Sequence, residues 1–447
     1  MPSAIFTIGR TGLTASRLSL ELTAQNIANA ANPDYSRRQL TQSELVMTGT
    51  IGVGASADSL GGIRPGVVVR AESALVQRQA RDSASALAAA EAEFFAMREA
   101  ESALETSALF TGLIEFEAAL TELQGNPLEP ALRLSALESG RQMAGNFRIA
   151  HGTLANARSL AQDEAAAEVL TVNELTAELA EVNRDLVAAR EGTAGRAALL
   201  DARDKALRGL AEEFGIATTI NDNGTADVMI EGTPPVALVT GGMAASVAVS
   251  VNPDGTLAFD LGGTAFAPAG GAMAGRAAAL EQMADLQTGI DSLAASVIAI
   301  ANAAQASGSD AAGNPGQPLF SGTSAADIDI ALASASGLAT ALAGAPAGSR
   351  DTANLTALLA ALGAETGPAA GTDALLLGLS SRVSALDTRR EGLSVVAASA
   401  EAELLRETGV DLDTEAANLV RLQQAFEANS RVIQVATELF DTLLGLR

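Results

Sequence analysis

Apolar residues recur every seven positions at the start of the chain. The row is made up of Phe6, Leu13, Leu20 and Ile27, and a small residue follows each member three positions later. A seven-residue repeat keeps an apolar stripe on one side of a helix, where a second helix must cover it. The pattern therefore predicts an N-terminal helix whose apolar stripe packs against a second helix.

The same spacing returns at the end of the chain. Its members are Leu412, Leu419, Phe426, Ile433 and Phe440. A second row at an offset position consists of Leu422, Ala436 and Leu443, and polar Asn429 interrupts this second row. Matched stripes at both ends favour pairing of the terminal helices as a coiled-coil stalk over packing of each helix onto its own domain. We expect residues 1–40 and 405–447 to form this terminal coiled-coil domain.

Between the ends, most of the chain is rich in helix-forming residues, and one segment has the composition of β-strands. Residues 71–210 are rich in Ala, Glu, Leu and Arg, with a helix break at the prolines of QGNPLEP. From residue 214 the chain alternates β-branched and polar residues around Asn-Gly and Asp-Gly turns, which predicts a β-rich insert over 214–275. We predict a mainly α protein whose mostly helical body comprises 41–213 and 276–404.

Composition restricts the partners that the chain can have. Its 447 residues carry 53 acidic against 28 basic side chains, a net charge of −25, which opposes binding to nucleic acid and to anionic membrane surfaces. The most apolar run, near Leu293, is shorter than the roughly 20 residues that span a bilayer, so no membrane insertion is expected. The N-terminus also lacks the pattern of a cleavable secretory signal.

The sequence contains few of the residues that common catalytic and cofactor sites use. The chain has no cysteine and one histidine, His151, which excludes thiolate and His-rich metal sites. The single lysine, Lys205, stands in an apparent helix and not in a phosphate-binding loop. Pairs of carboxylates that act as acid and base in glycosidases leave no spacing signature in a sequence, so a site of that kind stays an open alternative. We therefore predict no enzyme activity, no cofactor and no metal site.

One acidic stretch leaves two interpretations open. NDNGTAD, around Asn223 and Gly224, resembles the start of a calcium loop but lacks the terminal glutamate of the EF-hand pattern. A hairpin turn is the interpretation that the Asn-Gly pair favours.

The most distinctive motif, GLTASRLSLELTAQNIANAANPDYSRRQ, resembles the N-terminal signature of axial flagellar proteins. The C-terminal segment NLVRLQQAFEANSRVIQVATELFDTLL is similar to their C-terminal partner helix. Three interior stretches, containing LQGNPLEP, LLDARD and GSDAAGNPGQPLF, resemble the hook-filament junction proteins, the FlgK family. Two positions depart from that family's pattern: Asp34 replaces a glycine, and Gln305 stands where histidine is common. Asp34 puts the geometry of its turn in question.

The resemblance implies a structural protein of the bacterial flagellum, exported by the type III apparatus, secreted, and placed between hook and filament. Its implied partners are the hook protein, hook-associated protein 3, copies of itself in a ring, and an export chaperone at the C-terminal helix. The assembly interface that we expect consists of Leu13, Leu20, Ile27, Asn29, Tyr35, Leu419, Phe426, Asn429, Ile433 and Phe440. A hook or distal rod protein is the alternative, and a secreted glycan hydrolase a remoter one.

Overall fold

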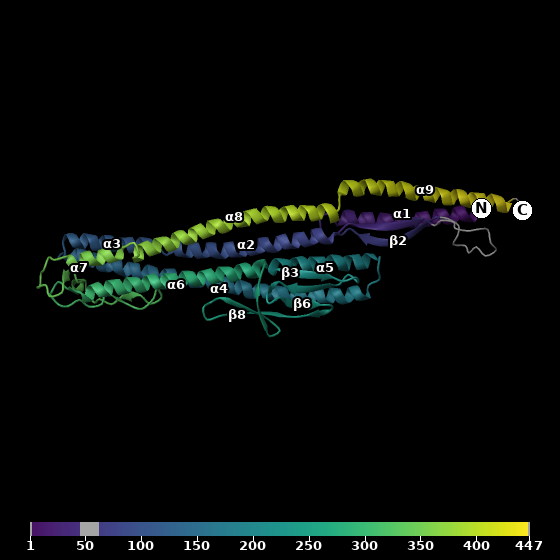
Figure 1. Ribbon diagram of the computed structural model, residues 1–447. Coiled ribbons are helices and arrows are strands. Elements are labelled where there is room, and N and C mark those ends of the chain that lie inside the picture. Colours follow the sequence, from purple (N-terminus) through teal and green to yellow (C-terminus); the bar gives the residue numbers. More distant parts are fainter. Residues whose placement is uncertain (1, 45–61, 446–447) are drawn as a thin grey trace. The chain divides into compact units, whose positions relative to one another are not determined.

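The computed structural model describes residues 2–44 and 62–445 of the chain (Figure 1). Long helices dominate the described residues, and a β-rich segment interrupts them. The helices are α1 (Pro2–Ala28), α2 (Ala74–Thr106), α3 (Leu109–Gly125), α4 (Pro130–Ala188), α5 (Ala194–Glu213), α6 (Gly271–Ala306), α7 (Ala353–Leu362), α8 (Pro368–Thr408) and α9 (Leu412–Gly445). The predicted fold class, mainly α with an inserted β-rich segment and long terminal helices, is confirmed.

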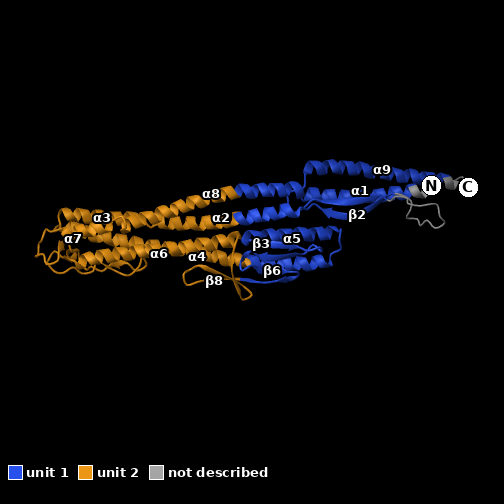
Figure 2. Cartoon of the chain, viewed as in Figure 1, with its two compact units in different colours: residues 1–86, 171–247, 394–447 blue, residues 87–170, 248–393 orange. Residues whose placement is uncertain are grey.

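The chain divides into two compact units (Figure 2). Unit 1 comprises residues 1–86, 171–247 and 394–447, and unit 2 comprises residues 87–170 and 248–393. The helices α2, α4 and α8 contribute residues to both units. These two units rest on compactness, whereas the three domains expected from the sequence were defined by type of secondary structure. The two divisions therefore differ, and the three-domain division remains a prediction.

A tight break separates α3 from α4 at the predicted position. Asn126 to Glu129 lie between the two helices, and Pro130 opens α4, where its missing N–H costs nothing. Arg133 in the first turn of α4 donates from Nε to the carbonyl of Pro127, at 2.6 Å. Its other nitrogens reach the carbonyl of Leu338 and the hydroxyl of Thr340, so one buried arginine fixes the loop before it and a distant loop.

The β-rich segment is built from short antiparallel strands. They are β3 (Ile216–Ile220), β4 (Ala226–Ile230), β5 (Gly232–Thr233), β6 (Val236–Thr240), β7 (Met243–Ala244), β8 (Val247–Val251), β9 (Leu257–Leu261) and β10 (Thr264–Pro268). In unit 1 the sheet order is β3-β4-β6-β7. Gly224, at φ +84°, closes the β3–β4 hairpin, which confirms the hairpin interpretation of the Asn-Gly pair.

Helix α6 supplies the centre of the unit 2 core. Its buried stripe includes Leu280, Met283, Ile290 and Val297, all fully excluded from solvent. By length and composition alone α6 could also cross a membrane, but a stripe of this kind is that of a core helix. Gln305, near its end, accepts a hydrogen bond from the backbone N–H of Ala339 at 2.7 Å, so the residue found in place of histidine has a structural partner.

Two strands after α1 were not predicted. β1 (Arg38–Glu44) and β2 (Ile63–Arg70) pair antiparallel within the segment expected to be helical. The run of β-branched valines in IRPGVVVR was the available signal, and the proline and glycine before it weaken a strand prediction. Smaller pairs complete the described strands: β11 (Gly308–Ser309) with β14 (Ala341–Leu342), and β12 (Phe320–Ser321) with β13 (Asp329–Ile330).

Candidate assembly site: the terminal helices and the turn after α1

Helices α1 and α9 lie side by side and run antiparallel (Figure 1). A Cβ atom built on Gly9 would lie 2.8 Å from Cγ1 of Ile433, and one built on Gly12 would lie 2.7 Å from Oδ1 of Asn429. Increasing residue numbers on one helix thus meet decreasing numbers on the other. The pairing of the two ends that the sequence predicted is present within one chain.

Small residues, not the predicted large ones, form the buried side of α1. Gly9 and Gly12 are buried, and Ala15 and Ser16 expose 2% and 7% of their surface. Of the predicted row, Phe6 is 45% exposed, and Leu13, Leu20 and Ile27 are half-buried. Glycine and serine let the two backbones approach closely, so the larger side chains of the row lie beside the contact.

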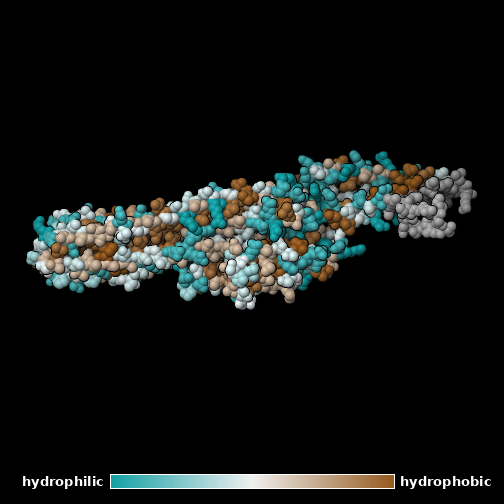
Figure 3. Space-filling view, in the orientation of Figure 1, coloured by the Kyte–Doolittle hydropathy of each residue, from teal (hydrophilic) through white to brown (hydrophobic). Residues whose placement is uncertain are grey.

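Helix α9 contacts α1 through a narrow strip and leaves much of its apolar surface uncovered. Ala436 is 2% exposed, Leu419, Phe426, Asn429 and Ile433 are half-buried, and Phe440 is 53% exposed. Further exposed apolar residues on this helix are Leu412, Val420, Val432, Val435 and Leu439. Apolar surface gathers near the C-terminal end of α9 in Figure 3. A surface of this kind on a helix pair indicates an interaction site.

The turn after α1 is built around Asn26. Its Oδ1 accepts hydrogen bonds from the Tyr35 hydroxyl, at 2.8 Å, and from the Arg38 backbone N–H, at 3.0 Å. Its Nδ2 donates to the Arg38 carbonyl at 2.9 Å. Asn26 is 1% and Tyr35 8% exposed. The buried amide of Asn26 thus connects the end of α1 to the start of β1. Tyr35 thus serves the turn of its own chain.

Asp34 contributes an ion pair to the turn and does not use the backbone conformation for which glycine is favoured. Its backbone φ is not positive, so the turn does not use the left-handed conformation that a glycine would offer. Its Oδ1 accepts a hydrogen bond from Arg208 of α5, at 2.8 Å, and its N–H donates to Asn32 Oδ1. The departure from the family pattern therefore comes with an ion pair that ties the turn to α5.

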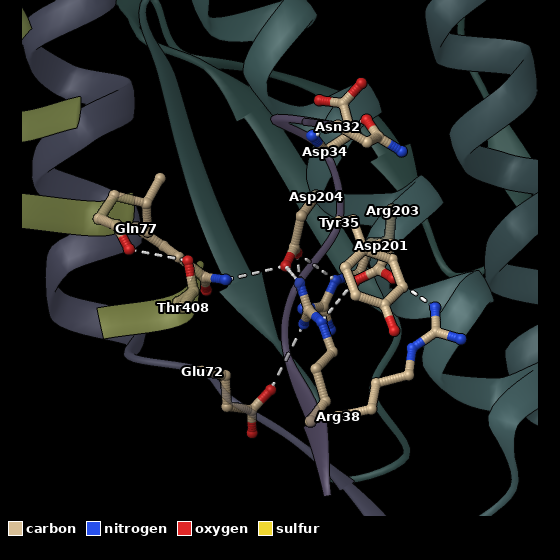
Figure 4. Close-up of polar contacts among 12 residues, drawn as sticks. Asn32, Asp34, Tyr35, Arg38, Glu72, Gln77, Asp201, Arg203, Asp204 and Thr408 are labelled. Atoms are coloured by element: carbon tan, nitrogen blue, oxygen red, sulfur yellow. Dashed lines mark hydrogen bonds and ion pairs between the residues drawn. The ribbon is translucent and has the colours of Figure 1, made fainter. Parts of the chain in front are cut away.

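A buried charge cluster joins this turn to β2 and α5 (Figure 4). Asp201 accepts from Arg38 at 2.6 Å and from Arg70 Nε at 2.7 Å. Asp204 accepts from Arg70, and from Arg203 at 2.7 Å. Each of these five side chains is at most 12% exposed. Removal of any one member is expected to destabilise the fold, because at least one buried charge would then lose a partner.

Charge interactions decide the protonation of Asp204. Burial favours the neutral acid, but Arg203 and Arg70 outweigh burial and hold the pKa of Asp204 below its usual value. Burial raises the pKa of Tyr35, against the opposing effect of Arg38, whose guanidinium lies 4.7 Å from the ring centre. Asp204 is therefore ionised and Tyr35 neutral at neutral pH.

Backbone contacts of Arg37 complete the anchoring of the turn. Its N–H donates to the carbonyl of Thr408, the last residue of α8, and its carbonyl accepts from the N–H of Ala71, both at 2.8 Å. Beside the turn an open cleft of about 560 Å³ is lined by Asn29, Asn32 and Lys205, among others. Asn29 thus lies at this cleft and not against α9.

The structure brings together only part of the predicted interface. Asn429 and Ile433 contact α1, while Asn29 and Tyr35 belong to the turn, and Phe440 lies exposed at the far end of α9. Sequence reasoning missed Asn26, Arg38, Arg70, Asp201 and Asp204. Charged residues far apart in the sequence carry no periodic signal, although the small residues of α1 were visible in the heptad pattern.

Metal-ligating side chains do not cluster in the part of the chain that the structure describes. Within residues 2–44 and 62–445, no group of three or more His, Asp or Glu side chains could hold a metal ion. His151 lies beside Gln287, with its Nδ1 3.3 Å from a carboxylate oxygen of Asp291, in a contact between helices of unit 2. This histidine thus serves packing between α4 and α6.

Two family comparisons bear on these helices. The helical domain of flagellar hook-associated protein FlgK matches residues 97–320, half of the chain. The chain belongs to the FlgK family. The C-terminal domain of the flagellar basal body rod FlgEFG proteins matches residues 403–446, which include α9. The second match alone would also fit the alternative of a hook or rod protein, and the FlgK match distinguishes between them.

Individual FlgK relatives are distant. Flagellar hook-associated protein 1 of Escherichia coli (strain K12) is 24% identical over 59% of this chain and 48% of its own length. The chain thus spans about half the length of this curated relative. The structure of the flagellar hook junction protein FlgK from Burkholderia pseudomallei aligns with a TM-score of 0.49 at 21% identity, over 54% of this chain and 46% of that one.

Proposed function

We propose that this FlgK-family chain is a structural component of the bacterial flagellum that forms the junction between hook and filament. The observation that carries the proposal is the apolar surface that the α1–α9 pair leaves uncovered. Ile5, Phe6 and Ile8 on α1 are 39–45% exposed, and Val435, Leu439 and Phe440 on α9 are 48–53% exposed. Burying a single side chain of this size contributes about 1.5–3 kcal/mol, so neighbouring subunits would gain considerably by covering them.

In this proposal the terminal helices form the inner tube of the assembly, with α1 and α9 packed against the pairs of adjacent subunits as a coiled coil. The three-part division of the chain follows from it: residues 1–40 and 405–447 build the tube, and the helical body and the insert 214–275 form outer layers. The Asn26 turn and the charge cluster fix the direction in which the chain leaves the tube.

The partners follow from that placement. Copies of the chain would contact one another in a ring, with the hook protein on one side and hook-associated protein 3 on the other. Before assembly, the exposed apolar face of α9 suits helix-in-groove recognition by an export chaperone, which would keep it covered until type III export. The role is structural and not catalytic.

The proposal is tested by incubating isolated hooks with the full chain and with a chain that lacks residues 405–447. We expect the full chain to cap hook ends in electron micrographs. The shortened chain should retain the helical signal of unit 2 in circular dichroism but leave hook ends bare. Undiminished capping by the shortened chain would contradict the assigned role of the terminal helices.

A second titration tests the chaperone. A peptide of residues 411–447 should bind the export chaperone of the same flagellar system in calorimetry, and a peptide with Val435→Ser and Phe440→Ser should bind more weakly. A peptide with Glu427→Gln and Gln434→Ser, changed at two exposed polar positions, is the matched control. Lack of binding by the unchanged peptide would contradict a chaperone site on α9, and equal affinity of all three peptides would contradict the role of its exposed apolar face.

A further inference from the structure

Asn429 is the polar residue that interrupts the offset apolar row of α9, between Leu422 and Ala436, and the structure places it over a gap in α1. A Cβ built on Gly12 would lie 2.7, 2.9 and 2.9 Å from Oδ1, Cγ and Nδ2 of Asn429, so the amide group occupies the space that any side chain at position 12 would need. Asn429 Nδ2 also lies 3.4 Å from the Ser16 hydroxyl oxygen. Gly12 and Ser16 together form a notch that holds this amide.

A neighbouring contact repeats the arrangement with an apolar side chain. Ile433, one turn further along α9, lies over Gly9, where an added Cβ would meet its Cγ1 at 2.8 Å. Asn429 and Ile433 thus insert into successive gaps of α1. The two insertions differ in what they require. Ile433 would be stabilised in any apolar surroundings, whereas the amide of Asn429 needs a hydrogen-bond partner.

We propose that Asn429 is a register-determining residue, which holds α9 in one antiparallel alignment against α1. The remaining apolar residues of the two helices recur every seven positions, so a slide by one repeat would again bring apolar side chains together. The amide breaks this equivalence. A slide in one direction brings Asn429 opposite Ile5, which offers no hydrogen bond, and both directions remove it from the notch of Gly12 and Ser16.

The alignment has a consequence for the surface that the helix pair presents. In the observed register, Leu439 and Phe440 of α9 lie at the same end of the pair as Ile5 and Phe6 of α1. A slide of one repeat would separate the exposed apolar residues of the two helices. Asn429 therefore determines the shape of the apolar face, although the inference concerns the free chain and does not depend on assembly into a flagellum.

The absence of cysteine from the chain allows a direct test by disulfide formation. The native alignment is reported by Gly9→Cys with Ile433→Cys, where the isoleucine change also removes the side chain that would meet the new Cβ. A displaced alignment is reported by Gly9→Cys with Phe426→Cys, one repeat away. Each pair is oxidised in the full chain at low concentration, and an isotopically labelled copy distinguishes bridges within a chain from bridges between chains.

With Asn429 in place, we expect bridges within the chain at the native pair and few at the displaced pair. Asn429→Leu should lower the ratio of native to displaced bridges about fivefold, the equivalent of one hydrogen bond of ordinary net strength. Helical content and thermal stability should not fall, because leucine suits an apolar row. Gln434→Leu, at an exposed position of the same helix, is the control and should leave the ratio unchanged.

Two results would overturn the proposal. One is an unchanged ratio in the Asn429→Leu chain, which would show that shape alone fixes the register. The other is the lack of a native bridge when Asn429 is present, which would show that α1 and α9 are not held in this alignment in the free chain. Neither result depends on whether the chain caps hooks, so failure here is distinguishable from failure of the proposed function.

Discussion

Individual residues hold the chain where it leaves α1, and Asp201 is central among them. It accepts hydrogen bonds from two buried arginines that lie far from each other in the sequence, Arg38 and Arg70. Asp34 adds a more exposed ion pair to Arg208. The turn is therefore anchored to α5 by contacts of unequal strength, because a buried pair is screened much less than an exposed one.

Asp201→Ala should lower the free energy of unfolding of unit 1 by about 3–5 kcal/mol, since it leaves two buried guanidinium groups without this partner. Urea denaturation followed by circular dichroism measures the change. Glu21→Gln is the matched control, because its ion pair with Arg17 is largely solvent-exposed and should contribute below about 1 kcal/mol. Similar losses for both variants would show that the cluster contributes no more than a surface pair.

Acid should weaken the same cluster. The folded-state pKa of Asp204 is depressed, so its contribution to stability is present above the ordinary aspartate pKa, about 3.9, and is lost as the pH falls through the folded value. The free energy of unfolding of the unchanged chain should decline below about pH 4 more steeply than that of Asp204→Asn, which has no proton to take up there. Parallel pH profiles of the two chains would contradict the assignment.

At the scale of elements, the sequence predicted the terminal helices, the break before α4 and the hairpin at Asn223-Gly224, because each has a local signal. It did not predict which side of α1 faces α9. Apolar periodicity identifies Leu13 and Leu20, but close approach of two helices selects Gly9 and Gly12. The charge cluster escaped prediction for another reason, since its partners come together only through the tertiary fold.

The glycines of α1 and α4 allow a test of helix approach. Gly12→Ala should destabilise the α1–α9 pair, by about 1–3 kcal/mol, because the added methyl meets Asn429. Gly145→Ala, in α4, has no heavy atom within 4 Å of the new Cβ and should stabilise its helix by about 0.5–1 kcal/mol. Hydrogen exchange resolves the two helices separately. Stabilisation by both changes would mean that α1 and α9 are not in close contact.

At the scale of the whole molecule, the core of unit 2 and the terminal helices differ in how much of their apolar surface is buried. Unit 2 buries a continuous core of its own around α6, whereas α1 and α9 expose apolar side chains along much of their length. A single chain is thus stable in its body and incomplete at its terminal helices. This contrast is what a subunit of a larger assembly requires.

We expect the exposed face of the α1–α9 pair to become buried when the chain joins the hook. Hydrogen exchange of the free chain and of the chain bound to isolated hooks measures this burial. Helices α1 and α9 should gain protection on hooks, while the core helices of unit 2, α6 among them, should be equally protected in both states. Unchanged exchange in α1 and α9, with new protection only in the body, would contradict it.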